Sequence, residues 1–116
     1  MSLLASVKDE RRGAVAIAHV EGEIDASNVW WVEERLRGPL TNECEVLVVD
    51  LTGTRYLDSG GIAMLFELAQ ALRQRQQQLR LVVAKGSSIA RMVDLTGLMA
   101  EVPTHPSLDG ALADRY

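Results

Sequence analysis

The chain has 116 residues, a length that suits one compact domain and leaves no room for a second hydrophobic core. Apolar residues make up 47% of it and charged residues 24%, which excludes the polar, strongly charged composition of a disordered chain. The formal net charge is −4 and the twelve Lys and Arg are scattered, which argues against a basic nucleic-acid-binding surface. We therefore expect a single domain over residues 1–116 that does not bind nucleic acid directly.

The sequence also lacks the marks of a secreted or membrane protein. Its only cysteine, Cys44, allows no intramolecular disulfide, which fits a reducing compartment. No apolar run approaches the roughly 20 residues of a membrane-spanning helix. Residues 1–12 lack the apolar core of a signal peptide. We expect a cytoplasmic protein that does not insert into a membrane.

Short apolar segments rich in β-branched residues predict strands at residues 14–20, 46–49 and 79–84. The last two read as buried strands because their apolar residues are nearly continuous. Residues 1–12 are expected to form an N-terminal strand or arm, joined to the next strand by a hairpin turn around Arg11-Arg12-Gly13.

Between the strands the apolar residues recur three or four positions apart, as they do on one face of a helix. The first stripe is Val29, Val32, Leu36 and Leu40, and the second is Ile62, Leu65, Ala69 and Leu72. A third helix is expected to begin at Ser87 or Ser88, where a hydroxyl can cap the first turn, and to end near Gly97. A short fourth helix is expected after Ser107.

The predicted order of elements is therefore β-β-α-β-α-β-α-β-α. A hairpin pairs its strands antiparallel, whereas strands joined by helical crossovers pair in parallel. We predict an α/β fold with a mixed sheet of about five strands and the helices packed mainly on one face of that sheet.

Three short motifs occur in order along this predicted fold. They are Gly22-Glu23-Ile24-Asp25 after the second strand, Leu57-Asp58-Ser59-Gly60-Gly61 at the start of the second long helix, and Asp94-Leu95-Thr96-Gly97-Leu98 in the third helix. Over residues 14–113, these motifs and their spacing resemble the STAS domain family, and in particular the bacterial anti-sigma factor antagonists, also called anti-anti-sigma factors.

The resemblance implies a partner-switching protein and not an enzyme, with no cofactor. In this family, the unphosphorylated antagonist binds a serine-kinase-type anti-sigma factor and thereby frees the sigma factor. The kinase later phosphorylates a Ser or Thr in the Asp-Ser loop, which breaks the complex. The residues that the resemblance places on the partner-binding face are Gly22, Glu23, Asp25, Asp58, Ser59, Gly60, Gly61 and Ile62. A weak homodimer is left open.

The chain departs from the family pattern in the Asp-Ser loop. The usual Asp-Ser-Ser/Thr-Gly is replaced by Asp58-Ser59-Gly60-Gly61, and in well-known members the second hydroxyl takes the phosphate. Ser59 is the only hydroxyl that remains there. Two hypotheses stay open for it: Ser59 is a displaced phosphoacceptor, or it is only the cap of the following helix.

The departure also keeps other functions open. One alternative is a constitutive STAS scaffold, or a subunit of a transporter or stressosome-type complex, that is not phosphorylated. A remote alternative is a phosphoaspartyl receiver-like domain, because Glu23, Asp25, Asp50 and Asp58 are all acidic. We disfavour it because such a domain needs an acidic pair after its first strand, which this chain does not offer, and we interpret Asp25 as the cap of the first helix.

A few further residues have structural interpretations. His19 and His105 lack neighbours at metal-ligand spacing, so we predict no metal site. Lys85-Gly86-Ser87-Ser88 lacks the long glycine-rich loop of a nucleotide site, and helix capping explains it. Trp30 and Trp31 are adjacent on a helix and point about 100° apart, so they are not both fully buried, and an exposed one could contact a partner.

Overall fold

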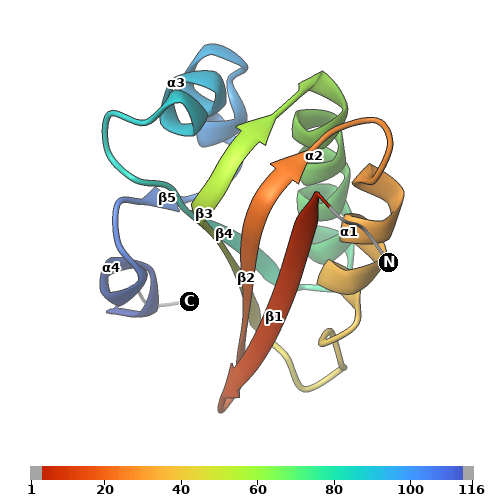
Figure 1. The fold of residues 1–116 in the computed structure, drawn as a ribbon. Helices are drawn as coiled ribbons and strands as arrows, with labels where there is room; N and C mark the ends of the chain where they lie inside the picture. The colour runs from red at the N-terminus through yellow and green to blue at the C-terminus, as the bar shows by residue number, and fades with distance from the viewer. Residues whose placement is uncertain (1–3, 114–116) are drawn as a thin grey trace.

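Residues 4–113 are described by a computed structural model, in which five strands form one sheet in the order β1-β2-β3-β4-β5 (Figure 1). The strands are β1 Ala5–Arg12, β2 Val15–Ile24, β3 Val46–Leu57, β4 Gln78–Val82 and β5 Thr104–His105. β1 pairs antiparallel with β2, and the other neighbours are parallel. The expected mixed sheet and its N-terminal hairpin are confirmed. The expected domain limits at residues 1 and 116 lie outside the described residues.

The helices alternate with the strands in the predicted order. They are α1 Val29–Arg37, α2 Ser59–Gln74, α3 Ser88–Leu95 and α4 Leu108–Ala113, with a short 3₁₀ turn at Leu98–Ala100. Ser87 caps α3 by accepting a hydrogen bond from the backbone N–H of Ala90, as expected for that serine. The first apolar stripe was extended too far: α1 ends at Arg37 because Gly38 and Pro39 follow, and Leu40 packs on the core from outside the helix.

Two strands are longer than the sequence indicates, and this corrects the predicted ends at residues 20 and 49. β2 runs on to Ile24 and β3 to Leu57. In these extensions buried residues such as Leu51 and Thr54 are separated by exposed ones, so the continuous apolar run that indicates a buried strand is lost. The extended ends of both strands carry the first two motifs.

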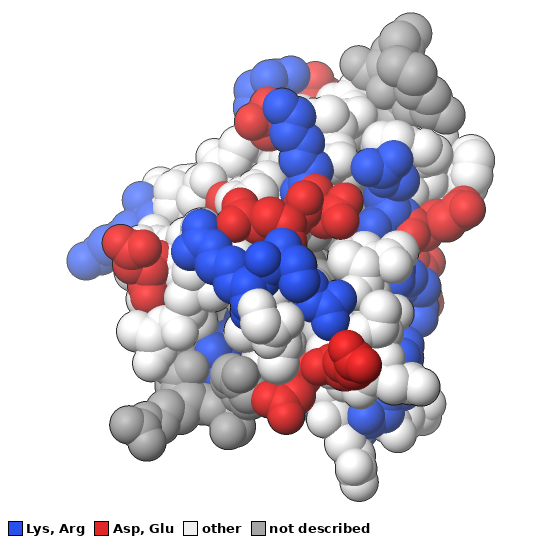
Figure 2. All heavy atoms as spheres, turned by 90° about the horizontal axis from the view of Figure 1, so that it is seen from below, with Lys and Arg blue, Asp and Glu red and all other residues white. Residues whose placement is uncertain are grey.

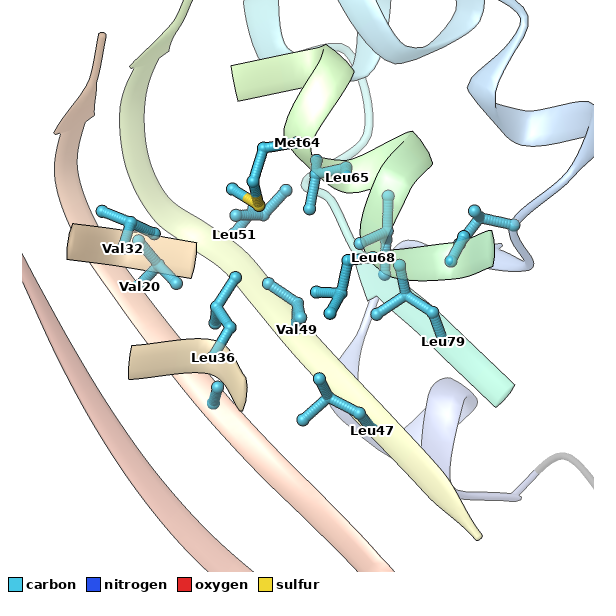
Figure 3. Close-up of a cluster of buried hydrophobic side chains, with 14 of the residues drawn as sticks. Val20, Val32, Leu36, Leu47, Val49, Leu51, Met64, Leu65, Leu68 and Leu79 are labelled. Atoms are coloured by element: carbon cyan, nitrogen blue, oxygen red, sulfur yellow. The ribbon is translucent and has the colours of Figure 1, made fainter. Parts of the chain in front are cut away.

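The main core lies between one face of the sheet and the helices α1 and α2, which cover the same side (Figure 1). Alternate residues of β3, including Leu47, Val49 and Leu51, point toward this side, where Leu65 and Leu68 of α2 meet them (Figure 3). All five side chains are at most 2% exposed. Burial of a side chain of this size stabilises the fold by about 1.5–3 kcal/mol. This face therefore holds the two long helices, and the strand ends next to them, in place.

Helix α4 covers part of the opposite face. Its Ala111 is buried against Ile17, Val46 and Val48, which alternate with the residues of the main core. Arg80 of β4 is 1% exposed, and its Nη1 donates to the carbonyl oxygen of Ala111 at 2.8 Å. A cation at the C-terminal end of a helix also interacts favourably with the helix dipole. α4 is thus anchored to the sheet by apolar packing and by one buried guanidinium.

Acidic and basic side chains both occur on the lower side of the molecule, as it is oriented in Figure 1. Figure 2 shows this side, where a group of acidic side chains lies between basic side chains. Some charged side chains form ion pairs: Nε of Arg12 and Oε1 of Glu10 lie 3.0 Å apart. The charges of the described residues on this side are therefore interspersed, in keeping with the scattered Lys and Arg in the sequence.

A three-residue ionic cluster links the first three strands. Nε2 of His19 in β2 lies 2.8 Å from Oε2 of Glu10 in β1, and Nδ1 lies 2.8 Å from Oδ2 of Asp50 in β3. Both carboxylates only accept hydrogen bonds when ionised, so the arrangement favours the imidazolium form, in which both ring nitrogens donate. Burial lowers the pKa of His19, but the bonds to Glu10 and Asp50 outweigh it and raise the pKa above its usual value.

This cluster predicts a pH dependence of stability. A raised folded-state pKa means that the contribution of His19 is full below its unfolded pKa and is lost as the pH rises through the folded pKa. Between about pH 6 and pH 8, the wild type should lose more stability than His19→Gln. The difference should be less than about 1 kcal/mol, because the three side chains of the cluster lie near the surface and solvent screens their charges. Urea unfolding of both proteins at each pH measures the difference. Parallel pH profiles for the two proteins would contradict the expected role of His19.

Candidate partner-binding site

The first two motifs meet at the ends of two parallel strands. In the register of β2 and β3, Glu23 is opposite Tyr56 and Ile24 is opposite Leu57. The backbone N–H of Asp58 donates to the carbonyl oxygen of Ile24 at 3.2 Å. The segments 22–25 and 58–62, which are more than thirty residues apart in the sequence, therefore form one edge of the molecule.

Asp58, and not Ser59, caps helix α2. Asp58 has an extended backbone, and its Oδ1 accepts a hydrogen bond from the backbone N–H of Gly61 at 3.0 Å. Ser59 is the first residue inside the helix, and it is exposed. The hypothesis that Ser59 serves only as the helix cap is therefore wrong, because the residue before it fills that role.

The two glycines of this loop differ in the space around them. A Cβ at Gly61 would lie 2.2 Å from Cδ1 of Leu57 and 3.3 Å from Cγ2 of Ile24, so Gly61 permits α2 to pack closely on both strand ends. A Cβ at Gly60 would meet only Oδ1 of Asp58, at 3.3 Å. Position 60 can therefore accept a small side chain with a slight shift of the Asp58 carboxylate, whereas position 61 is sterically closed.

Gly22 lies within β2, and this corrects the expectation that it belongs to a turn after the strand. Its φ is +102°, a conformation that residues with a side chain rarely adopt. A Cβ there would lie 2.0 Å from the carbonyl oxygen of Leu4. The same oxygen accepts a hydrogen bond from the N–H of Glu23 at 2.9 Å. Gly22 thus allows Leu4, the residue before β1, to lie directly against the motif.

Asp25 follows β2 and does not cap α1, contrary to the sequence interpretation. Its Oδ1 accepts hydrogen bonds from both the hydroxyl and the backbone N–H of Ser27, which stabilise the turn before the helix. These two bonds lower the pKa of Asp25. Helix α1 begins only after Asn28. Because Asp25 is partly exposed, its carboxylate remains accessible to a partner.

Asn28 is a structural residue of this edge that sequence reasoning missed. It is only 4% exposed, and its Nδ2 donates to the carbonyl oxygen of Glu23 at 2.8 Å. Its Oδ1 accepts from the N–H of Asp25 at 3.0 Å. Asn is a common residue before a helix, which is the only signal that could have found it. Asn28 fixes the segment 23–25 relative to α1.

The predicted site residues divide into exposed and buried groups. Ser59 is exposed, and Glu23, Asp25, Asp58 and Gly60 are partly exposed. In contrast, Gly22, Gly61 and Ile62 are buried. The first group can contact a partner with side-chain or backbone atoms, while the second group shapes the edge from below.

A groove that the sequence did not indicate lies beside this edge, between the end of β3 and helix α3. It has a volume of about 350 Å³, and its lining residues are Arg55, Tyr56, Leu57, Ser88, Ile89, Arg91, Met92, Leu95 and Thr96. Two of the few exposed large apolar residues lie in it, Tyr56 at 49% exposure and Leu95 at 77%. Leu95 and Thr96 belong to the third motif, so this groove brings that motif next to the other two.

The tryptophans of α1 are arranged as the helical spacing indicates. Trp30 is 63% exposed, and Trp31 is partly buried against the core. The guanidinium of Arg35 lies 5.8 Å from the centre of the Trp31 ring, within the range of a cation–π interaction. The prediction that the two indoles are not both buried is confirmed.

Two further features, a metal site and a membrane-spanning helix, are not found in residues 4–113. No group of three or more His, Cys, Asp or Glu side chains in this range is arranged to hold a metal ion. None of the helices in the same range is long and apolar enough to cross a membrane. The described residues instead offer an exposed helix start, a turn with a carboxylate and an apolar groove on one edge of the sheet.

The described residues form a small α/β domain with a five-stranded mixed sheet, and the three motifs lie together at one edge of it. The chain belongs to the STAS domain family, whose sequence profile matches residues 6–111. The resemblance of its motifs to that family is confirmed.

Curated relatives and solved structures agree with this assignment. The chain is 30% identical to the anti-sigma-F factor antagonist RsfA of Mycobacterium tuberculosis over 106 residues, which cover 90% of this chain and 82% of RsfA. It is 33% identical to the anti-sigma-B factor antagonist of Listeria monocytogenes over 98 residues, with 84% of each chain covered. The crystal structure of an anti-sigma factor antagonist from Mycobacterium paratuberculosis matches with a TM-score of 0.84 and 27% identity, over 94% of this chain and 92% of that one.

Proposed function

We propose that this protein is an anti-sigma factor antagonist of the cytoplasm that binds a serine-kinase-type anti-sigma factor through the edge formed by residues 22–25 and 58–62. Phosphorylation of Ser59 then releases the partner. The observation that carries this proposal is the position of Ser59: it is exposed, it opens α2, and Asp58 already caps the helix. The relatives named as antagonists of anti-sigma-F and anti-sigma-B factors support an anti-sigma factor as the partner.

The first turn of α2 suits a hydroxyl that gains and loses a phosphate. A phosphoserine carries about two negative charges at neutral pH, and the N-terminus of a helix favours an anion through its unpaired N–H groups and its dipole. The fold therefore tolerates phosphate on Ser59. A partner surface that packs against this edge does not tolerate the phosphate, because binding would then desolvate a dianion beside the partly exposed carboxylate of Asp58. Release of the partner follows from this difference.

The other exposed groups of the edge suit recognition by hydrogen bonds and charge. Glu23 lies within 3.7 Å of Arg55, and Asp25 presents a carboxylate whose lowered pKa keeps it ionised. A charged pair at the centre of an interface contributes specificity more than raw affinity. We expect Asp25 to face a basic group of the anti-sigma factor.

A second function is favoured by one specific observation, the glycine at position 60. Because the customary second hydroxyl is missing, the chain could act as a constitutive scaffold, or as a subunit of a transporter or stressosome-type complex, that binds its partner without a phosphorylation cycle. In that case the same edge binds the partner, and no kinase modifies Ser59. At this edge, the two functions are therefore distinguished by whether Ser59 is phosphorylated.

Intact-mass spectrometry after incubation with ATP and the serine-kinase anti-sigma factors of the same source separates the two functions. We expect the wild type to gain one phosphate and Ser59→Ala to gain none. Gly60→Ser serves as the matched positive variant, because position 60 has room for a side chain and regains the usual second hydroxyl. A kinase that modifies Gly60→Ser but not the wild type would support the constitutive function.

A further inference from the structure

The groove between β3 and α3 brings several apolar side chains together at the surface. Its floor includes Leu57 and Ile89, both buried, and Met92, which is partly buried. Its walls include Tyr56 and Leu95, which are 49% and 77% exposed. Contiguous apolar surface of this kind marks an interaction site more often than isolated exposed residues do.

The orientation of α3 explains why this surface stays open. Ile89 and Val93 are buried in the core, and Ile89 also forms part of the groove floor. The other groove residues of α3 recur at the three- and four-residue spacing of a second helix face: Ser88, Arg91, Met92 and Leu95. α3 lies near the C-terminal end of β3 (Figure 1). β4 pairs with β3 only as far as Asp50, so no strand within residues 4–113 covers this side of the end of β3.

The rim of the groove is positively charged although the chain as a whole carries a formal charge of −4. Arg55 and Arg91 both line the groove. The side chain of Arg55 is 74% exposed and pairs only loosely with Glu23, at 3.7 Å. No ion pair within residues 4–113 involves Arg91, which is exposed. The lining contains no acidic residue to balance these two cations.

We propose that this groove binds a segment of the partner that inserts a large apolar side chain between Tyr56 and Leu95 and carries acidic residues beside it, opposite Arg55 and Arg91. The proposal rests on the proposed function, because it assigns a second contact to the same partner. Continuity supports it: Leu57 lines the groove and is followed directly by Asp58 and Ser59 of the proposed partner-binding edge. Charge complementarity selects an acidic segment over a basic one.

The first test uses the protein and its anti-sigma factor. Leu95→Ser and Arg91→Glu should each weaken binding about tenfold or more, as removal of a central apolar or charged contact does. Matched controls are Met99→Ser, an exposed apolar residue outside the groove lining, and Arg75→Glu, an exposed cation at the far end of α2. Both controls should leave the affinity within about twofold. Wild-type affinity in both groove variants would overturn the proposal and leave the proposed function intact.

The second test does not depend on the natural partner. A short peptide with a central Phe-Leu pair between glutamates is titrated into the isotope-labelled protein, and the same peptide with lysines in place of the glutamates is the control. The acidic peptide should shift the amide signals of Tyr56, Met92 and Leu95, and Arg91→Glu should reduce that response. Equal responses to both peptides, or shifts confined to other residues, would overturn the proposal. If no anti-sigma factor of the source binds the wild type, the proposed function fails and this titration still decides what the groove binds.

Discussion

Ser59→Asp is expected to weaken binding of the anti-sigma factor by a factor of ten or more, while Ser59→Ala should bind within about threefold of the wild type. Aspartate places a negative charge at the first residue of α2, where the helix tolerates it but an apposed partner surface must desolvate it. Alanine removes only a hydroxyl from an exposed position. Titration calorimetry with the purified anti-sigma factor measures both affinities.

The matched control for this charge is Gln74→Glu, which adds one negative charge at the opposite end of α2, also on the surface. This variant should keep the affinity of the wild type, so that a general effect of net charge can be told from an effect at the edge. Strong binding by Ser59→Asp would mean that a charge at this position does not switch the interface. The constitutive function would then be the better account.

Gly22→Ala is expected to lower the free energy of unfolding by about 3 kcal/mol or more. Two costs add: the φ of +102° is unfavourable for a residue with a side chain, and the new Cβ would lie 2.0 Å from the carbonyl oxygen of Leu4. Relief of that contact must move Leu4 and weaken its hydrogen bond with Glu23. Small domains are stable by only about 5–15 kcal/mol, so the loss should be obvious in urea unfolding monitored by tryptophan fluorescence.

Gly13→Ala separates the two costs. Gly13 also has a positive φ, of +62°, but its Cβ position has no neighbour within 4 Å. We therefore expect a loss of only about 1 kcal/mol, from the backbone conformation alone. If Gly22→Ala cost no more than Gly13→Ala, the close approach of Leu4 to the motif would not be a constraint on this edge.

The sequence predicts the sheet and the helices of this protein well because its apolar pattern is regular. The nearly continuous apolar residues at 46–49 locate the central strand, and the stripe that includes Leu65 and Leu72 locates the face of α2 that meets the core. The prediction fails at element ends. β3 continues beyond residue 49 into a stretch where Thr52 and Gly53 are exposed, and no local pattern distinguishes this stretch from a loop.

The caps of α1 and α2, unlike the Ser87 cap of α3, could not be assigned from sequence for a different reason. Asp58 and Ser59 are adjacent, and both are good cap residues, so a shift of one residue decides which of them fills the role. The same ambiguity applies to Asp25 and Asn28 before α1, where the cap position falls on Asn28. Only the backbone geometry of the turn resolves such choices, and here it leaves Ser59 without a capping role.

The groove and the ionic cluster depend on contacts that are distant in sequence. Leu95 lies 39 residues after Tyr56 in the chain, and its exposure depends on how α3 is placed against β3. His19 meets Glu10 and Asp50 only because the register of three strands brings these side chains together. Periodicity within one segment carries no information on such pairs, so the sequence predicts the strands of His19 and Asp50 without predicting their contact.

The function we propose requires that this protein binds a kinase-type anti-sigma factor and is released by phosphorylation of Ser59. The most direct measurement is size-exclusion chromatography with light scattering of the protein mixed with the purified serine-kinase anti-sigma factor of its source, before and after addition of ATP. We expect a wild-type complex that forms without ATP and dissociates with ATP, and a complex of Ser59→Ala that persists. Absence of a complex with every such kinase, or a wild-type complex that is unchanged by ATP, would contradict the proposed function.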